Sequence, residues 1–85
     1  MPDPVMTERD VPRDVPLTLL GEGVRARVMR LDEPGSQGTA HLVALGVLPG
    51  VEVTLLQRFP AFVLRMGHTE FALDEQLARR IYVAR

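Results

Sequence analysis

The sequence contains no cysteine and no lysine. Without cysteine, the chain has neither disulfide bonds nor thiolate metal ligands to supplement its core. Without lysine, Schiff-base chemistry and a lysine-dependent phosphate-binding loop are excluded. All ten basic residues are therefore arginine. We interpret them as scattered surface charge, because charges spread through a sequence usually lie on solvated faces.

Long hydrophobic runs are absent as well. No apolar stretch approaches the ~18 residues that a membrane-spanning helix needs. The N-terminus, Met1-Pro2-Asp3-Pro4, is acidic and rich in proline, unlike a secretory signal peptide. With 85 residues and a net charge of −1, the chain predicts one small cytoplasmic domain without direct membrane insertion.

Residues 1–16 differ in composition from the rest. Four of the seven prolines fall there, together with two arginines and four acidic residues, which give this segment a net charge of −2. Its few apolar side chains cannot offset the conformational entropy that ordering would cost. The sequence therefore predicts a flexible N-terminal tail over residues 1–16 and a folded domain over residues 17–85.

The folded part reads as short strands separated by turns, because apolar and polar residues alternate in several stretches. The strands are expected at 24–29, 51–59, 61–66, 69–73 and 81–83. A short helix is expected at about 37–45 with Ser36 as its N-cap, and a single helical turn after Asp74. Five short strands with so little helix predict a mainly β protein, a small bent antiparallel sheet that closes toward a barrel.

The stretch from residue 42 to 50 carries the clearest local motif. Leu42 and Leu45 share one face of the expected helix. Gly46 follows where a helix end favours a residue that tolerates positive φ. Pro49 and Gly50 then suit the two central positions of a type II turn. This motif predicts the helix exit and the start of the next strand.

Three stretches, in this order, resemble the FeoA family: Leu17…Leu20…Gly23…Ala26…Val28, then Leu42-x-x-Leu45-Gly46-x-x-Pro49-Gly50-x-x-Val53, then Phe71-Ala72-Leu73…Ala78-x-x-Ile81-x-Val83. The resemblance implies an SH3-like barrel, similar to the C-terminal domain of DtxR-type metal-dependent repressors. It also implies a cytoplasmic accessory of ferrous iron transport that docks on the cytosolic G domain of the FeoB permease. At the level of the family it implies transition metal ion binding.

The residues themselves offer no convergent site for chemistry. Ser36 and His41 lie five apart near a helix start and point to different faces, with no acid placed to orient the imidazole. The two histidines, His41 and His68, fall in separate elements without a metal-ligand spacing. We therefore expect no enzyme activity, no catalytic or metal-ligating residue and no cofactor.

Binding to another protein is the function that remains. The expected contact residues are Phe59, Pro60 and Phe62 at a strand connection, with His41 as a further polar contact. A more specific form of this hypothesis is an arginine finger that acts on the partner's G domain, with Arg58 or Arg65 as candidates.

The alternatives are a free-standing interaction module related to repressor C-terminal domains, or a small nucleic-acid-binding barrel. Residues 17–85 carry a net charge of only +1, which argues against nucleic acid. Self-association is left open.

Overall fold

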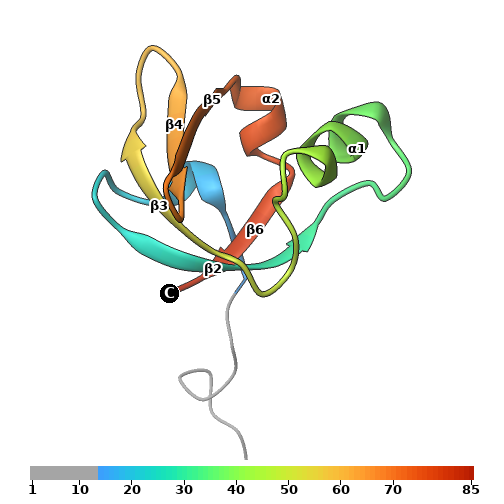
Figure 1. Cartoon of the computed structure of the whole chain (residues 1–85), viewed down its shortest axis with the longest axis horizontal. Coiled ribbons are helices and arrows are strands. Elements are labelled where there is room, and N and C mark those ends of the chain that lie inside the picture. Colours follow the sequence, from blue (N-terminus) through green and yellow to red (C-terminus); the bar gives the residue numbers. More distant parts are fainter. Residues whose placement is uncertain (1–13) are drawn as a thin grey trace, which may run out of the picture.

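The computed structural model describes residues 14–85, which form a single six-stranded antiparallel sheet with the strand order β1-β6-β2-β3-β4-β5 (Figure 1). The elements, in chain order, are β1 (Val15–Pro16), η1 (Leu17–Leu19), β2 (Arg25–Leu31), α1 (Gln37–Ala44), β3 (Glu52–Gln57), β4 (Phe62–Met66), β5 (Thr69–Leu73), α2 (Glu75–Ala78) and β6 (Ile81–Ala84). The five expected strands correspond to β2–β6, so the mainly β fold is confirmed.

A sixth strand, β1, lies inside the segment expected to be a tail. Val15 pairs with Val83, and Pro16 pairs with Tyr82. Pro16 is tolerated because β1 is an edge strand, where a missing amide donor breaks no ladder. The ordered part therefore begins before residue 17, the expected boundary. Residues 1–13 of the expected tail lie outside the described residues.

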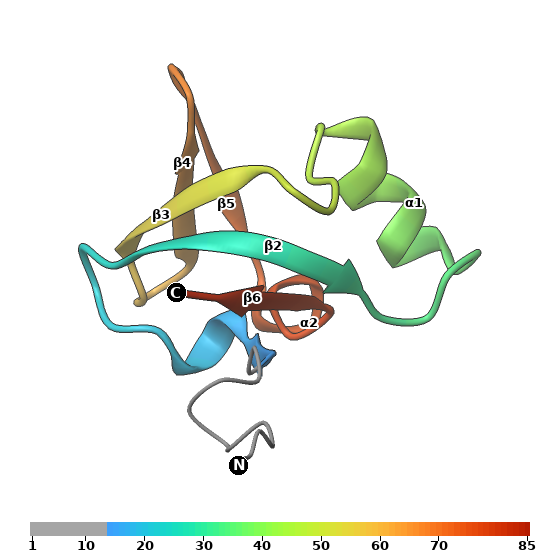
Figure 2. The same cartoon turned by 90° about the horizontal axis from the view of Figure 1, so that it is seen from below.

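The sheet curls around one core, and Figure 2 shows its neighbouring strands β2, β3 and β6 side by side. Because successive side chains of a strand point to opposite faces of the sheet, every second residue points into the core. In β4, for example, Phe62 and Leu64 are buried while Arg65 is exposed. The helix α2 contacts both β5 and η1, and thus bridges the gap between the two edges of the sheet. The buried core residues are Leu17, Leu20, Ala26, Val28, Leu42, Val47, Val53, Leu55, Phe62, Leu64, Leu73, Ala78, Ile81 and Val83.

Side-chain caps fix the start of both helices. The Ser36 hydroxyl accepts a hydrogen bond from the Thr39 amide at 3.1 Å, and the Asp74 carboxylate accepts one from the Leu77 amide at 2.8 Å. Each cap satisfies an amide that lacks a partner within the helix. The expected N-cap at Ser36 and the expected helical turn after Asp74 are both confirmed.

The exit from α1 uses two glycines with left-handed backbone. Gly46 and Gly50 both have φ +94. The Val47 amide bonds back to the Leu42 carbonyl at 3.0 Å, and the Val51 amide bonds to the Leu48 carbonyl at 3.1 Å. The second bond closes a turn with Pro49 and Gly50 at its centre, which delivers the chain into β3. Leu42 is fully buried and Leu45 is half-buried against the core.

Among residues 14–85, no helix is long and apolar enough to cross a membrane.

Candidate protein-docking site

The loop between β3 and β4 carries the most exposed large apolar side chain of the described residues. Phe59 is 84% exposed, and Pro60, to which it is joined by a cis peptide bond, is exposed beside it. Phe62, expected as a further contact, is only 9% exposed and belongs to the core. That expectation was wrong: Phe62 is the first residue of β4 and shares its inward face with Leu64. Truncating Phe62 would remove core volume rather than an exposed contact.

Arg58 ties this loop to η1. Its guanidinium Nη1 donates to the Thr18 carbonyl at 2.7 Å and also to the Leu20 carbonyl. Its backbone amide donates to Glu22 Oε2 at 3.0 Å. The guanidinium lies 5.7 Å from the centroid of the Phe62 ring. Arg58 is thus committed to contacts within the domain, and its role as an arginine that reaches into a partner is not supported by this geometry.

Leu19 completes the exposed apolar surface at this end of the molecule. It is 70% exposed and lies between the two carbonyls that Arg58 binds, while Phe59 follows Arg58 directly. The hydrogen bonds of Arg58 therefore hold the backbone on either side of Leu19 close to the loop that carries Phe59. We call Leu19, Phe59 and Pro60 the Phe59 surface. Leu19 was missed in the sequence because nothing local separates it from Leu17 and Leu20, which are buried.

His41 lies away from the Phe59 surface. It is exposed on α1, which stands on the opposite side of the molecule from the β3–β4 loop in Figures 1 and 2. There it lines a hollow of about 480 Å³ between α1 and α2, together with Ser36, Asp74 and Arg80. His68 is exposed in the β4–β5 turn. Within residues 14–85, no group of three or more His, Asp or Glu side chains could hold a metal ion.

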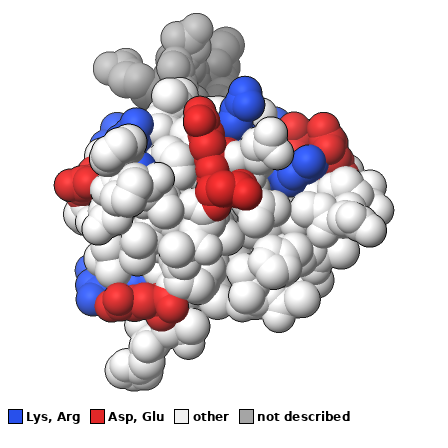
Figure 3. Space-filling model, turned by 90° about the horizontal axis from the view of Figure 1, so that it is seen from above, with Lys and Arg blue, Asp and Glu red and all other residues white. Residues whose placement is uncertain are grey.

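The segment from α1 to the turn before β3, residues 37–51, carries no acidic residue and no arginine. Val43 and Leu48 are exposed there. Figure 3 shows a broad area without charged side chains on this view of the molecule. The protein thus has a second exposed apolar surface, and a test of the Phe59 surface needs a control on this one.

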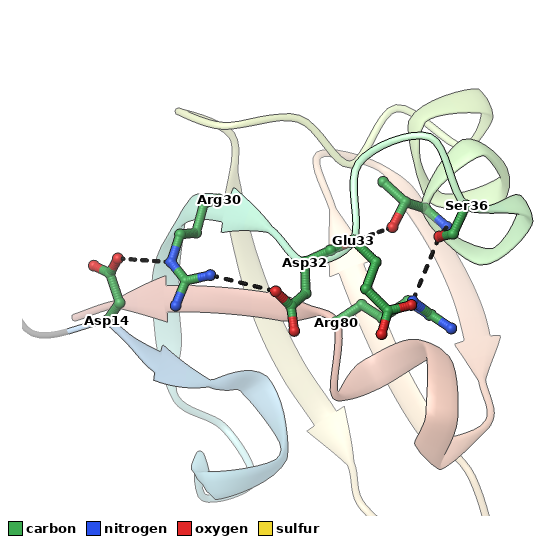
Figure 4. Close-up of polar contacts among 7 residues, drawn as sticks. Asp14, Arg30, Asp32, Glu33, Ser36 and Arg80 are labelled. Atoms are coloured by element: carbon green, nitrogen blue, oxygen red, sulfur yellow. Dashed lines mark hydrogen bonds and ion pairs between the residues drawn. The ribbon is translucent and has the colours of Figure 1, made fainter.

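Ion pairs join the ends of the sheet to the turn before α1 (Figure 4). Arg30 pairs with Asp14 at 3.4 Å and with Asp32 at 3.6 Å, and its guanidinium stacks 3.9 Å from the centre of the Tyr82 ring. These contacts hold the start of β1 against β2 and β6. Both carboxylates of the group pair with the same guanidinium, so we interpret these contacts as structural.

A second group of polar contacts lies at the start of α1. Arg80 binds Glu33 and lies 3.4 Å from the Ser36 hydroxyl. The Arg80 Nε is buried and has no hydrogen-bond partner among the described residues. It packs against Gly38, where a side chain would meet it.

Comparison with known proteins decides the family. The family model of the FeoA domain matches residues 15–85. The chain belongs to the FeoA family. The iron uptake regulatory protein FeoA, in a crystal structure, is 28% identical with a TM-score of 0.74, and the match covers 84% of this chain and 95% of that one.

Two further structures extend the likeness. FeoA of Stenotrophomonas maltophilia, an SH3 domain protein complexed with zinc and a candidate ferrous iron transport activating factor, is 26% identical with a TM-score of 0.70. That match covers 79% of this FeoA chain and 86% of the other. A manganese-dependent transcriptional repressor shares the fold alone, at 18% identity and a TM-score of 0.79.

The repressor match covers 87% of this chain but 42% of the repressor. The expected SH3-like fold, shared with repressor domains, is confirmed. Comparison with curated protein sequences gives no match.

Proposed function

We propose that this FeoA protein is a non-enzymatic cytoplasmic accessory of ferrous iron uptake that docks on the cytosolic part of an FeoB-type permease. Membership of the FeoA family supports the role in iron transport. The Phe59 surface supports docking, and it is the observation on which this proposal chiefly rests.

An exposed phenylalanine beside a second exposed apolar residue offers a partner apolar area to remove from water. Phe59 leaves most of its ring in water, and Leu19 is largely exposed as well. Covering two such side chains releases apolar surface from water, and aromatic side chains often dominate the affinity of protein interfaces. Because Arg58 holds the loop and η1 together, little ordering is needed on binding, which favours affinity.

The test is binding of the full chain to the purified cytosolic part of the permease, with and without guanine nucleotide, measured by biolayer interferometry. Phe59→Ser should weaken binding about 30-fold, corresponding to about 2 kcal/mol for an interface anchor. Leu19→Ser should weaken it in the same direction. Both residues are exposed, so the melting temperature of each variant should stay within a few degrees of the parent's.

The matched control is Leu48→Ser, which removes an exposed leucine from the uncharged surface near α1. It should leave the affinity unchanged. Equal losses in Phe59→Ser and Leu48→Ser would contradict the choice of surface. Failure of the parent protein to bind the permease under any nucleotide condition would contradict the proposed function itself.

A further inference from the structure

An arginine-lined hollow lies on the outer surface of the sheet, on the strands that Figure 2 shows side by side. It has a volume of about 380 Å³ and sits where β2 runs between β3 and β6. We call it the arginine hollow. Its lining residues are Arg25, Ala26, Arg27, Met29, Glu52, Ala84 and Arg85.

The side chains of the arginine hollow carry more positive than negative charge. The lining includes three arginines and one acidic residue, Glu52, whose carboxylate lies 4.0 Å from Arg25 with both side chains largely exposed. The other ion pairs among residues 14–85 involve Arg30 and Arg80, so neither Arg27 nor Arg85 has an acidic partner within this part of the chain. The arginines of the hollow can therefore pair with a further negatively charged group.

Arg27 is held in place by the backbone. Its Nη1 donates to the Gly50 carbonyl at 3.0 Å, in the turn that leads into β3. The remaining donors of the same planar group stay available, and a guanidinium matches the two oxygens of a carboxylate. A fixed guanidinium loses less conformational entropy on binding than a free one.

We propose that the arginine hollow binds an acidic segment of a protein partner, with a carboxylate of that segment seated between Arg25 and Arg27. The inference deepens the proposed function and rests on it, because it names the chemistry of a second contact with the docking partner. Glu52 already shows that a carboxylate fits beside Arg25. The acidic side chain of the partner pairs with Arg25 and Arg27 in the same way.

The size and lining of the arginine hollow suit a polypeptide segment. Its volume of about 380 Å³ is many times the roughly 10–15 Å³ that a cavity needs to hold one water molecule, so it has room for several atoms of a bound chain. Half-buried Met29 adds an apolar wall for the carbon atoms of the bound chain. Small Ala84 leaves room for that chain to approach the sheet.

The first experiment needs no permease. A short poly-glutamate peptide is titrated into the full chain while NMR follows the backbone amides of β2 and the arginine Nε–H signals. Shifts should concentrate on Arg25, Arg27 and their neighbours, and a poly-glutamine peptide should give none. The affinity should fall about tenfold in Arg25→Gln/Arg27→Gln and with rising salt, because exposed charge pairs are screened. Arg79→Gln, which changes the exposed arginine directly after α2, should bind like the parent.

The second experiment uses the permease. Arg25→Gln/Arg27→Gln should lower the association rate about tenfold and flatten its salt dependence, whereas Phe59→Ser should act mainly on the dissociation rate. Permease binding that is unchanged in the double variant overturns the inference while leaving the proposed function standing. So does peptide binding that is unchanged. Binding of inorganic phosphate or of phosphatidylglycerol vesicles that depends on Arg25 and Arg27 and exceeds peptide binding also overturns it.

Discussion

Replacing Gly38 by alanine sets two effects of opposite sign against each other. Gly38 lies inside α1, and alanine in a helix interior is favoured over glycine by about 1 kcal/mol. From helix propensity alone the substitution should stabilise the protein. The structure adds an opposing effect, because a Cβ at Gly38 would lie 2.7 Å from the Arg80 Nε and 3.2 Å from its Cζ.

The cost of Gly38→Ala in stability comes from the contacts that Arg80 would lose. To make room, its guanidinium must leave Glu33 and Ser36, which it joins to the start of α1. A partly exposed ion pair of this kind contributes about 0.5–1 kcal/mol, and the displaced side chain adds strain. The two effects should therefore cancel or leave Gly38→Ala slightly destabilised. In an Arg80→Ala background the obstacle is gone, and Gly38→Ala should stabilise by about 1 kcal/mol.

Urea unfolding of the four proteins in this double-mutant cycle measures the coupling, which should be about 1 kcal/mol or more. Ala40→Gly is the matched control, since Ala40 is an exposed position in the same helix. It should cost about 1 kcal/mol in both backgrounds, because only helix propensity changes. Equal stabilisation by Gly38→Ala with and without Arg80 would refute this account of the contact.

Two further predictions concern the α1 exit and the Phe59 surface. Gly46→Val should lower the free energy of unfolding by more than about 1 kcal/mol, because the residue has φ +94 and lies against Met66, and Pro49→Ala should cost less. Urea melts that show equal, negligible losses at both sites would contradict this view of the turn. Arg58→Met should cost about 1–2 kcal/mol, because two backbone carbonyls lose a charged donor, and it should weaken permease binding through Leu19 and Phe59. A variant as stable as the parent that also binds normally would show that Arg58 does not hold the loop to η1.

Local patterns predicted most of the fold. The alternation of apolar and polar residues located β2–β6, and the cap at Ser36 located the start of α1. The same alternation also predicts that Phe62 is buried, because Phe62 lies two residues before Leu64 and shares its face of β4. Phe71 of β5 is half-buried against the core.

What the sequence could not predict depends on contacts between distant residues. The pairing of β1 with β6 joins residues far apart in the chain, and no local pattern distinguishes Val15 from its neighbours. The acceptors of Arg58 are backbone carbonyls in η1, and a backbone carbonyl has no signature in a sequence. The exposure of Leu19 and the burial of Leu17 also depend on contacts with distant parts of the chain, so the sequence does not distinguish these two leucines.

The position of β6 inside the sheet has a consequence for how the chain folds. This strand is the last in sequence, yet it lies between β1 and β2 and contributes fully buried Ile81 and Val83. During synthesis the β3–β4–β5 meander can pair as it emerges, but β1 has no neighbour until residues 81–84 are available. Folding is therefore delayed until the end of translation of this region, and a chain cut short before residue 81 exposes an unpaired edge of β2 to aggregation.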